Sequence, residues 1–240
     1  MTRLIVARRY CGPPNSGNGG YVSGLLANTL GVHASVALRA PIPLDKDMTF
    51  LRDGENGQLR DGETLIAEAK RADRAALPVP PPAPSLEEAR EAGKRFVSFH
   101  PICLTCADKL GPTESLCVHA GQRSDAPQGQ MAAVWTADAS FADEHGVLGE
   151  EFVWAALDCP GFYAWAETEG RHFALLGTMQ AEVLTLPRAG REYVVSAWTL
   201  EQQSARKRTS GVALYDADGA LMARALQVWI RMDAPQPPAG

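Results

Sequence analysis

The same order of predicted elements occurs twice along this chain of 240 residues, and this repetition constrains the fold more than any other feature. Each copy has a strand, then a helix rich in small and apolar residues, then long segments of alternating apolar and polar residues. The first copy occupies residues 3–10, 19–29, 33–39 and 50–71, and the second 130–136, 151–165, 173–184 and 192–232. One helix followed by an antiparallel meander excludes a doubly wound sheet, which needs helices between successive strands. The sequence therefore predicts an α+β fold of two similar units, each an antiparallel sheet wrapped around one central helix.

The alternating segments carry one hairpin signal in each copy. Asp61-Gly62 and Asp218-Gly219 favour a tight type I′ turn, because Asp and Gly both tolerate positive φ. In the helical segments small residues are frequent, among them Gly20, Gly24 and Ala155. We expect them to let each helix lie close against its own sheet.

A proline-rich stretch at residues 77–84 separates the two copies. Such a run neither continues a helix nor donates a ladder of hydrogen bonds, so we expect a stiff, exposed linker. Ser85 follows it as the predicted N-cap of a short helix. The expected organisation is a first unit at 1–77, a linker and connector at 78–127, a second unit at 128–234 and a tail at 235–240.

Composition excludes several classes of function. The formal net charge is −5 and no stretch concentrates Lys and Arg, which argues against nucleic acid as a partner. The N-terminus carries charges where a signal peptide needs an apolar run, and no segment is apolar for long enough to span a membrane. We therefore expect a cytoplasmic protein. Five cysteines without a secretion signal favour reduced thiols over a disulfide framework.

Two stretches resemble a known family, the double hotdog thioesterases. Residues 151–158, Glu-Phe-Val-Trp-Ala-Ala-Leu-Asp, resemble the hotdog helix of the phenylacetate-pathway type of thioesterase, in which an Asp closes an apolar stretch. Residues 205–231 resemble the closing hairpin of the bacterial acyl-CoA thioesterase II type. This resemblance implies a tandem hotdog fold and places functional residues at Asp158, Gln227 and Arg231, with Thr178 as the hydroxyl on the strand after the helix.

The resemblance has two departures. After Gln227 the family usually has an acidic residue and a Gly, whereas Val228 and Trp229 stand here, which leaves the substrate preference open. In the first unit, residues 14–20 are similar to the His-Gly-Gly entry of related helices. Asn18 takes the place of the His, before Gly19 and Gly20.

Hydrolysis of a thioester needs an activated water or a carboxylate nucleophile. Asp158 is the candidate, since an apolar helix would desolvate it and raise its pKa; the alternative is a residue at a helix break before Pro160. Gln227 has an acceptor and two donors with which to hold a water beside Asp158. If Leu226 and its aliphatic neighbours face the helix, however, strand alternation points Gln227 away from its own core. It would then face the cleft between the units or solvent.

Substrate-binding groups are expected at the helix entries and in the last hairpin. The backbone amides of Gly19 and Gly20, or those from Glu151 to Trp154 at the start of the second helix, could bind the oxyanion. Arg206 and Arg208 belong to a basic run that we expect to be exposed and that would suit a coenzyme A phosphate, although a solvated turn is the alternative.

The cysteines also fit a zinc site in their spacing. Cys103 and Cys106 form a C-x-x-C pair, and Cys117 and His119 could complete four ligands. Two observations argue against zinc. Ala107 stands where a zinc knuckle usually has Gly, and the resemblance to hotdog proteins with a similar Cys-x-x-Cys stretch does not imply zinc. We therefore expect no metal and no cofactor other than coenzyme A as part of the substrate.

The leading hypothesis is an acyl-CoA thioesterase that uses water activated by an Asp. The second is an acyl or acyl-CoA binding protein without catalysis on the same scaffold. A hotdog hydratase or dehydratase ranks lower, because the sequence lacks the Asn-Pro-x-His arrangement. Assembly of the double unit into homo-oligomers is left open.

Overall fold

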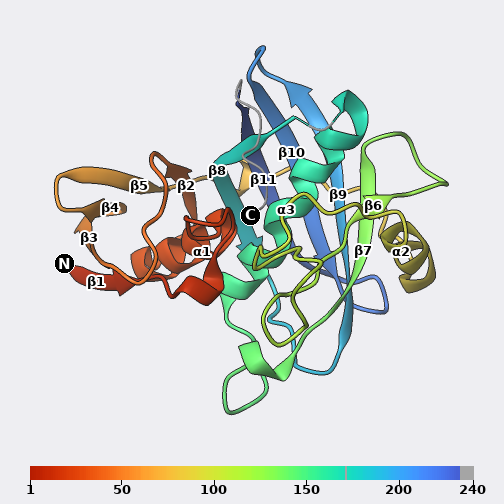
Figure 1. Ribbon diagram of the computed structural model, residues 1–240, viewed down its shortest axis with the longest axis horizontal. Coiled ribbons are helices and arrows are strands. Elements are labelled where there is room, and N and C mark those ends of the chain that lie inside the picture. The colour runs from red at the N-terminus through yellow and green to blue at the C-terminus, as the bar shows by residue number, and fades with distance from the viewer. Residues whose placement is uncertain (171, 233–240) are drawn as a thin grey trace.

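The computed structural model describes residues 1–170 and 172–232. The predicted tail at 235–240 and the last two residues of the second unit lie outside these residues. Figure 1 shows the first unit in red and orange beside the second unit in green and blue, each with one helix at its centre. Within the described part of the chain, no helix is long and apolar enough to cross a membrane.

The first unit consists of five strands around helix α1 (Gly19–Leu30). Its strands are β1 (Thr2–Ile5), β2 (Ala34–Leu38), β3 (Asp47–Asp53), β4 (Asn56–Asp61) and β5 (Thr64–Arg71). They pair antiparallel in the order β1-β3-β4-β5-β2. The Asn18 side chain caps α1 by accepting from the Tyr21 N–H, and Gly31 ends the helix at φ 70°.

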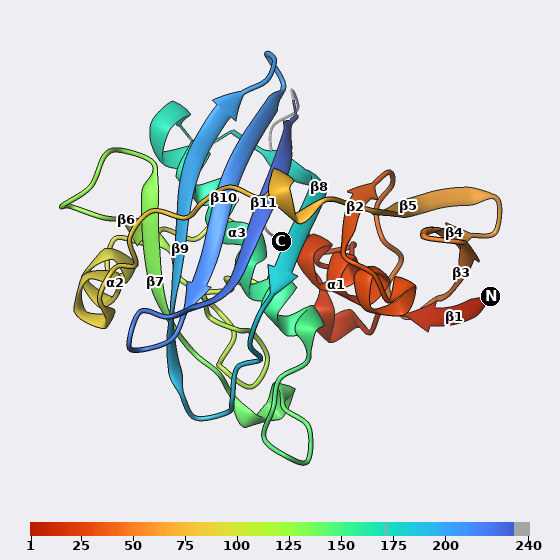
Figure 2. The same ribbon diagram turned by 180° about the vertical axis from the view of Figure 1, so that it is seen from behind.

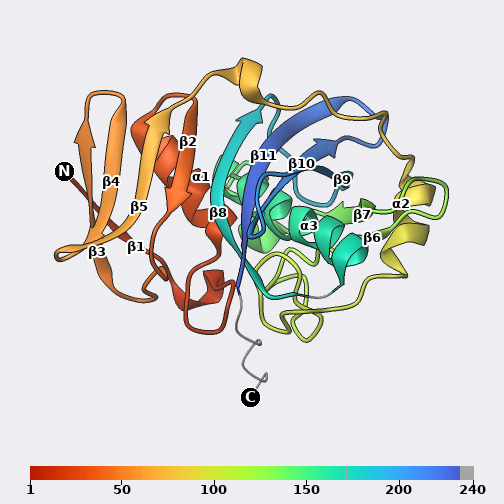
Figure 3. The ribbon, with the colours of Figure 1, turned by 90° about the horizontal axis from the view of Figure 1, so that it is seen from above.

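The second unit curls around the longer helix α3 (Glu150–Glu169). Its strands are β7 (Gln130–Thr136), β8 (Ala174–Val183), β9 (Glu192–Gln202), β10 (Lys207–Tyr215) and β11 (Leu221–Arg231), with the short β6 (Gly121–Gln122) at the edge. They pair in the order β8-β11-β10-β9-β7-β6. In Figure 3 these strands wrap around α3.

The two units join edge to edge and helix to helix. Strand β2 pairs with β8 through Ser35–Gln180, Val36–Met179 and Ala37–Thr178, so the described strands form one eleven-stranded sheet. Helices α1 and α3 pack against each other in the hollow of this sheet. Both units therefore contribute to the region between these helices.

The connector is an integral part of the second unit. The predicted helix is α2 (Leu86–Gly93), with a capping box between Ser85 and Glu88. Through Ala89 and Ala92 it packs against the outer face of β7 and β9, the face opposite α3. The proline-rich linker runs across the outer face of the second unit in Figure 2, and the Tyr215 hydroxyl donates to the Pro81 carbonyl at 2.9 Å. The linker, predicted to be stiff and exposed, is thus anchored to the second unit.

The first strand is shorter than predicted, and the two Asp-Gly turns are not of the predicted type. The first strand ends at Ile5 and not at residue 10, because the chain turns into a 3-10 helix (Arg8–Tyr10) that the Asp45 carboxylate holds through the Arg8 N–H at 2.8 Å. At the two Asp-Gly turns only the glycines have positive φ, 58° at Gly62 and 84° at Gly219. Neither turn is therefore type I′, which requires positive φ at two residues.

Candidate active site

Helices α1 and α3 touch backbone to backbone at two glycines. A Cβ on Gly20 would lie 2.5 Å from the Trp154 carbonyl oxygen, and one on Gly24 would lie 2.7 Å from Glu151 Cα. The contacts run in opposite directions along the two helices, which therefore cross antiparallel. We expected these glycines to bring a helix close to its own sheet; instead they bring the two helices together. Trp154, a predicted substrate-binding residue, is buried in this crossing.

Asp158 lies on α3 opposite the N-terminus of α1. Its Oδ2 accepts a hydrogen bond from the Gly20 N–H at 2.9 Å, and its side chain is buried, with 4% of the residue exposed. Among the described residues Oδ1 has no hydrogen-bond partner. Burial is the main reason that the pKa of Asp158 is raised to about 7. The helix break before Pro160, which was considered as the alternative, does not occur, since α3 continues through Pro160 to Glu169.

Asn18 connects three segments at this point. Besides capping α1, its amide Nδ2 donates to the Thr105 hydroxyl oxygen at 3.1 Å, and that hydroxyl donates to the Ala155 carbonyl in α3 at 2.7 Å. Asn18 and Thr105 are both buried. The predicted first-unit site residue therefore positions the helix entry relative to the connector and α3.

A cavity of about 530 Å³ opens beside Asp158. The first unit contributes the loop at residues 12–19 and residues 38–42, and the connector and the second unit contribute the remaining walls. Apolar side chains predominate, among them Phe162, Phe173 and Trp229. Asn18, Gly19 and Asp158 also line the cavity. The polar end of the cavity, at the N-terminus of α1, thus adjoins an apolar part. The volume is within the range of ligand sites in proteins.

Gln227 is buried against its own helix, contrary to the prediction that it would point away. Its amide nitrogen donates to the backbone carbonyls of Leu157 at 2.7 Å and of Asp158 at 3.0 Å, and its Oε1 accepts from the Trp229 indole N–H at 3.0 Å. The face of β11 toward α3 is therefore the one with Gln227, and Leu226 lies on the other. Gln227 bonds to the backbone of Asp158 and is not among the described residues that line the cavity.

Thr178 lies on the face of the sheet opposite Gln227. It pairs with Val228, whereas Gln227 pairs with Met179, and directly opposed residues in a sheet share a face. A register shift between Val228 and Trp229 leaves Gly177 between the paired residues, so the alternation changes at this point. The structure therefore does not bring the Thr178 hydroxyl together with Asp158.

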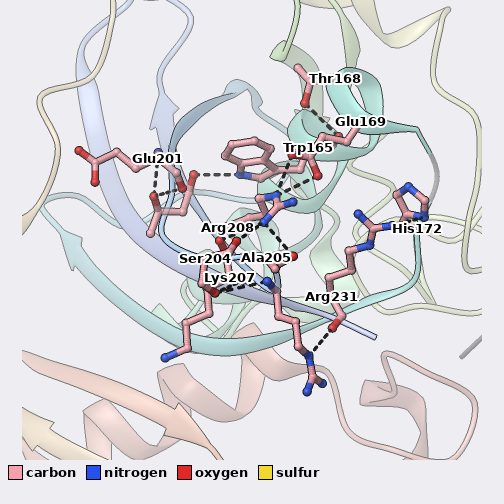
Figure 4. A network of polar contacts seen from close by, with 12 residues as sticks. Trp165, Thr168, Glu169, His172, Glu201, Ser204, Ala205, Lys207, Arg208 and Arg231 are labelled. Carbon is pink, nitrogen blue, oxygen red and sulfur yellow. Dashed lines mark hydrogen bonds and ion pairs between the residues drawn. The ribbon is translucent and has the colours of Figure 1, made fainter. Parts of the chain in front are cut away.

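Only part of the predicted phosphate-binding run is exposed. Arg208 is 5% exposed; its Nε donates to both Glu169 carboxylate oxygens at 2.8 Å, and its guanidinium lies over the Trp165 ring at 5.5 Å. Figure 4 shows this network between the end of α3 and β10. Arg208 is thus neutralised inside the protein, which contradicts its expected exposure. Arg206 is exposed, and its Nε donates to the Arg231 carbonyl at 3.3 Å.

The cysteines gather in a different set from the one considered as a zinc site. Cys103, Cys106 and Cys159 are buried with their sulfurs within 4.8 Å of one another. Cys117 lies elsewhere, with its sulfur 3.8 Å from the Leu110 carbonyl oxygen, and the His119 ring nitrogen bonds to the Ala107 carbonyl oxygen at 2.8 Å. Cys103 and Cys106 also belong to the main hydrophobic core.

Sequence reasoning missed several residues of this region. Thr105, Cys159 and the cavity-lining Phe162 were not singled out. Cys159 directly follows Asp158, and Thr105 lies inside the C-x-x-C stretch, so each is close in sequence to a predicted candidate residue. No sequence pattern, however, pairs residue 103 with residue 159, because their contact depends on how the connector folds back.

Solved structures of hotdog proteins match nearly the whole chain. A TesB protein from Mycobacterium avium subsp. paratuberculosis has a TM-score of 0.63 at 13% identity over 96% of this chain and 92% of its own. Acyl-CoA thioesterase II TesB2 from Mycobacterium marinum has a TM-score of 0.62 at 13% identity, with the same coverage. A conserved hot dog fold protein from Alicyclobacillus acidocaldarius has a TM-score of 0.62 at 14% identity over 98% and 93%.

These likenesses confirm the predicted fold: the chain is a double hotdog protein with the architecture of the TesB-type thioesterase II structures. No protein-family model matches the sequence, and neither does any curated protein. At 13–14% identity the likeness is one of fold. The activity must therefore be argued from the site itself.

Proposed function

We propose that this protein hydrolyses acyl-CoA thioesters, with the acyl group in the apolar cavity and the thioester beside Asp158. The observation that carries the proposal is the state of this carboxylate. One oxygen is held by the Gly20 N–H, and the other is buried without a partner among the described residues, in a side chain that lines the cavity. Acyl-CoA thioesterase II TesB2 from Mycobacterium marinum, which shares the fold, supports the same substrate class.

In the proposed reaction Asp158 acts as a general base. Its Oδ1 accepts a proton from a water molecule, the water oxygen attacks the thioester carbonyl, and the proton passes to the departing coenzyme A sulfur. The negative charge on the carbonyl oxygen would be stabilised by the N–H of Gly19. That group is the first of α1, so it has no partner inside the helix and lies at the positive end of the helix dipole. The products are a carboxylic acid and free coenzyme A.

Replacement of Asp158 by Asn tests the proposal. Asn keeps the size and the hydrogen-bonding capacity but cannot accept the proton, so we expect release of free thiol from a panel of acyl-CoAs to fall by about 10²-fold or more. Asp218→Asn, in the exposed turn between β10 and β11, is the matched control and should keep the wild-type rate. Wild-type turnover by folded Asp158→Asn would contradict the proposal.

A second candidate function is acyl-CoA binding without hydrolysis. It is favoured by Gln227, whose amide bonds to the α3 backbone rather than to a water next to the Asp158 carboxylate. For a binding protein, acyl-CoAs should raise the melting temperature while no thiol is released. For a thioesterase, the same ligands should be consumed, and only Asp158→Asn should give a lasting increase in melting temperature.

Arg206 is the candidate for the coenzyme A phosphates. It is exposed, whereas Arg208 is already paired. Arg206→Ala should therefore raise KM for acyl-CoA several-fold with little change in kcat. Arg3→Ala, at the far edge of the first unit, is the control and should change neither constant.

A further inference from the structure

Three thiols from two distant segments of the chain surround one point beside the cavity. Cys103 and Cys106 come from the connector, and Cys159 comes from α3. The Cys103 and Cys159 sulfurs are 3.5 Å apart, and all three sulfurs lie within 4.8 Å of one another. Each of the three residues is buried. This convergence is independent of the proposed hydrolysis, which uses none of the three.

The spacing of the sulfurs matches shared coordination of one ion. Thiolates bound to Zn²⁺ lie about 2.3 Å from the metal, so two of them in a tetrahedral site are about 3.8 Å apart. A disulfide instead requires about 2.05 Å between sulfurs. The sulfurs of Cys103 and Cys159 are 3.5 Å apart and no pair is more than 4.8 Å apart, so small side-chain rotations suffice for shared coordination, whereas a disulfide needs a larger approach.

The surroundings suit a bound cation. Cys103 and Cys159 line the cavity, so an ion has an entry path, and a fourth ligand such as water can come from the same side. The Asn18 amide lies 3.8 Å from the Cys103 sulfur and the Tyr163 hydroxyl 3.7 Å from the Cys106 sulfur, so that both can hold the thiolates in place. These neighbours supply the outer contacts that metal sites usually have.

We propose that Cys103, Cys106 and Cys159 form a binding site for a thiophilic cation, Zn²⁺, whose fourth ligand faces the cavity. Thiolate sulfur selects soft cations, with Zn²⁺ and Cu⁺ the common choices. Three thiolates and Zn²⁺ leave one negative charge in this buried place, whereas Cu⁺ leaves two, and burial disfavours the larger charge. Binding releases the three thiol protons to solvent, and the ion joins the connector to α3.

The test uses the full chain, reduced and freed of metal, and reads metal binding rather than turnover. We expect one equivalent of Zn²⁺ to bind and one equivalent of Co²⁺ to give an intense thiolate charge-transfer band. Cys103→Ser and Cys159→Ser should weaken binding at least tenfold. Cys11→Ser and Cys117→Ser, which lie outside the cluster, are the controls and should bind as the wild type does. Binding that survives in folded Cys159→Ser would overturn the site.

Alkylation of the wild-type protein keeps the test decisive if a variant fails to fold. Zn²⁺ should protect the three cluster cysteines from alkylation at least tenfold and leave Cys117 unprotected. Protection of Cys117 instead, or a Cys103–Cys159 disulfide in the protein as isolated, would overturn the proposal. Binding of Cu⁺ to the cluster without any binding of Zn²⁺ would overturn the choice of ion. Loss of thioesterase activity alone would not bear on any of these results.

Discussion

Gln227 lies next to the candidate site, but its contacts differ from those expected. Its amide nitrogen donates to the backbone carbonyls of Leu157 and Asp158 in α3. Gly161 permits this approach, since a Cβ there would lie 1.8 Å from Gln227 Oε1. We infer that Gln227 positions Asp158 by fixing α3 on the sheet.

Gln227→Ala should therefore lower stability as its first effect. Removal of the amide leaves the Trp229 indole N–H without its partner and creates a cavity, at a cost of about 1–3 kcal/mol. Thermal unfolding should show a clear decrease in melting temperature, whereas Gln203→Ala, on an exposed turn, should show none. A variant of wild-type stability with greatly reduced kcat would mean that Gln227 acts on the reacting water after all.

At single positions the sequence could predict residue types better than directions. Asp158 was expected in an apolar helix, and the structure places it in one. The alternation of faces along β11 was predicted correctly, but the face that contacts α3 was not. The small side chains of Ala223 and Ala225 leave room for the helix, so their face packs against α3 instead of the face with the larger aliphatic residues. The position of Thr178 relative to Gln227 could not be predicted, because the register of β8 against β11 pairs residues about 50 apart in sequence and has no local signal.

The crossing of α1 and α3 is the element-scale feature on which the site depends. Gly20 provides both the close approach and the N–H that holds Asp158. Helix ranges could be predicted from the repeated pattern of small and apolar residues. The surface against which the small residues pack could not be predicted, because the sequence of one helix does not distinguish a close contact with a sheet from one with another helix.

Gly20→Ala should disturb the crossing and the site together. The added Cβ meets the Trp154 carbonyl, a backbone group that cannot rotate away, so the helices must separate at a cost of about 1–3 kcal/mol. We expect a lower melting temperature and a loss of thioester hydrolysis. Gly111→Ala is the matched control, since its Cβ would meet no atom within 4 Å. Unchanged melting and turnover in Gly20→Ala would contradict this role of the glycine.

The contact between the end of α3 and β10 depends on Arg208. Arg208→Ala leaves Glu169 without its buried partner and removes the contact with Trp165, which should cost roughly 1–3 kcal/mol. Calorimetry should show the decrease in stability, and KM for acyl-CoA in the folded variant should stay close to the wild-type value. A several-fold increase in KM without loss of stability would restore Arg208 as a phosphate ligand.

At the scale of the whole molecule, neither unit is complete alone. Strand β8 is an edge of the second unit until β2 pairs with it, and Phe152 on α3 packs against Tyr10 and Tyr21 of the first unit. The tandem arrangement could be predicted from the repeated order of elements. The joining of both sheets into one could not, because the β2–β8 pairing connects residues about 140 apart in sequence and has no local signal.

The second unit expressed as residues 78–240 should therefore fail to form a stable monomer. Without the first unit, the backbone of β8 is unpaired along the segment that faces β2, and an exposed edge strand recruits another chain. The Asp158 carboxylate also loses the Gly20 N–H, and the aromatic face of α3 meets water. We expect the fragment to be insoluble or to form dimers through β8, as light scattering after size exclusion would show, beside the full chain as the control. A monomeric fragment with a cooperative thermal transition would show that the second unit folds without the first, because the β8 edge and the α3 face would then be stable in water.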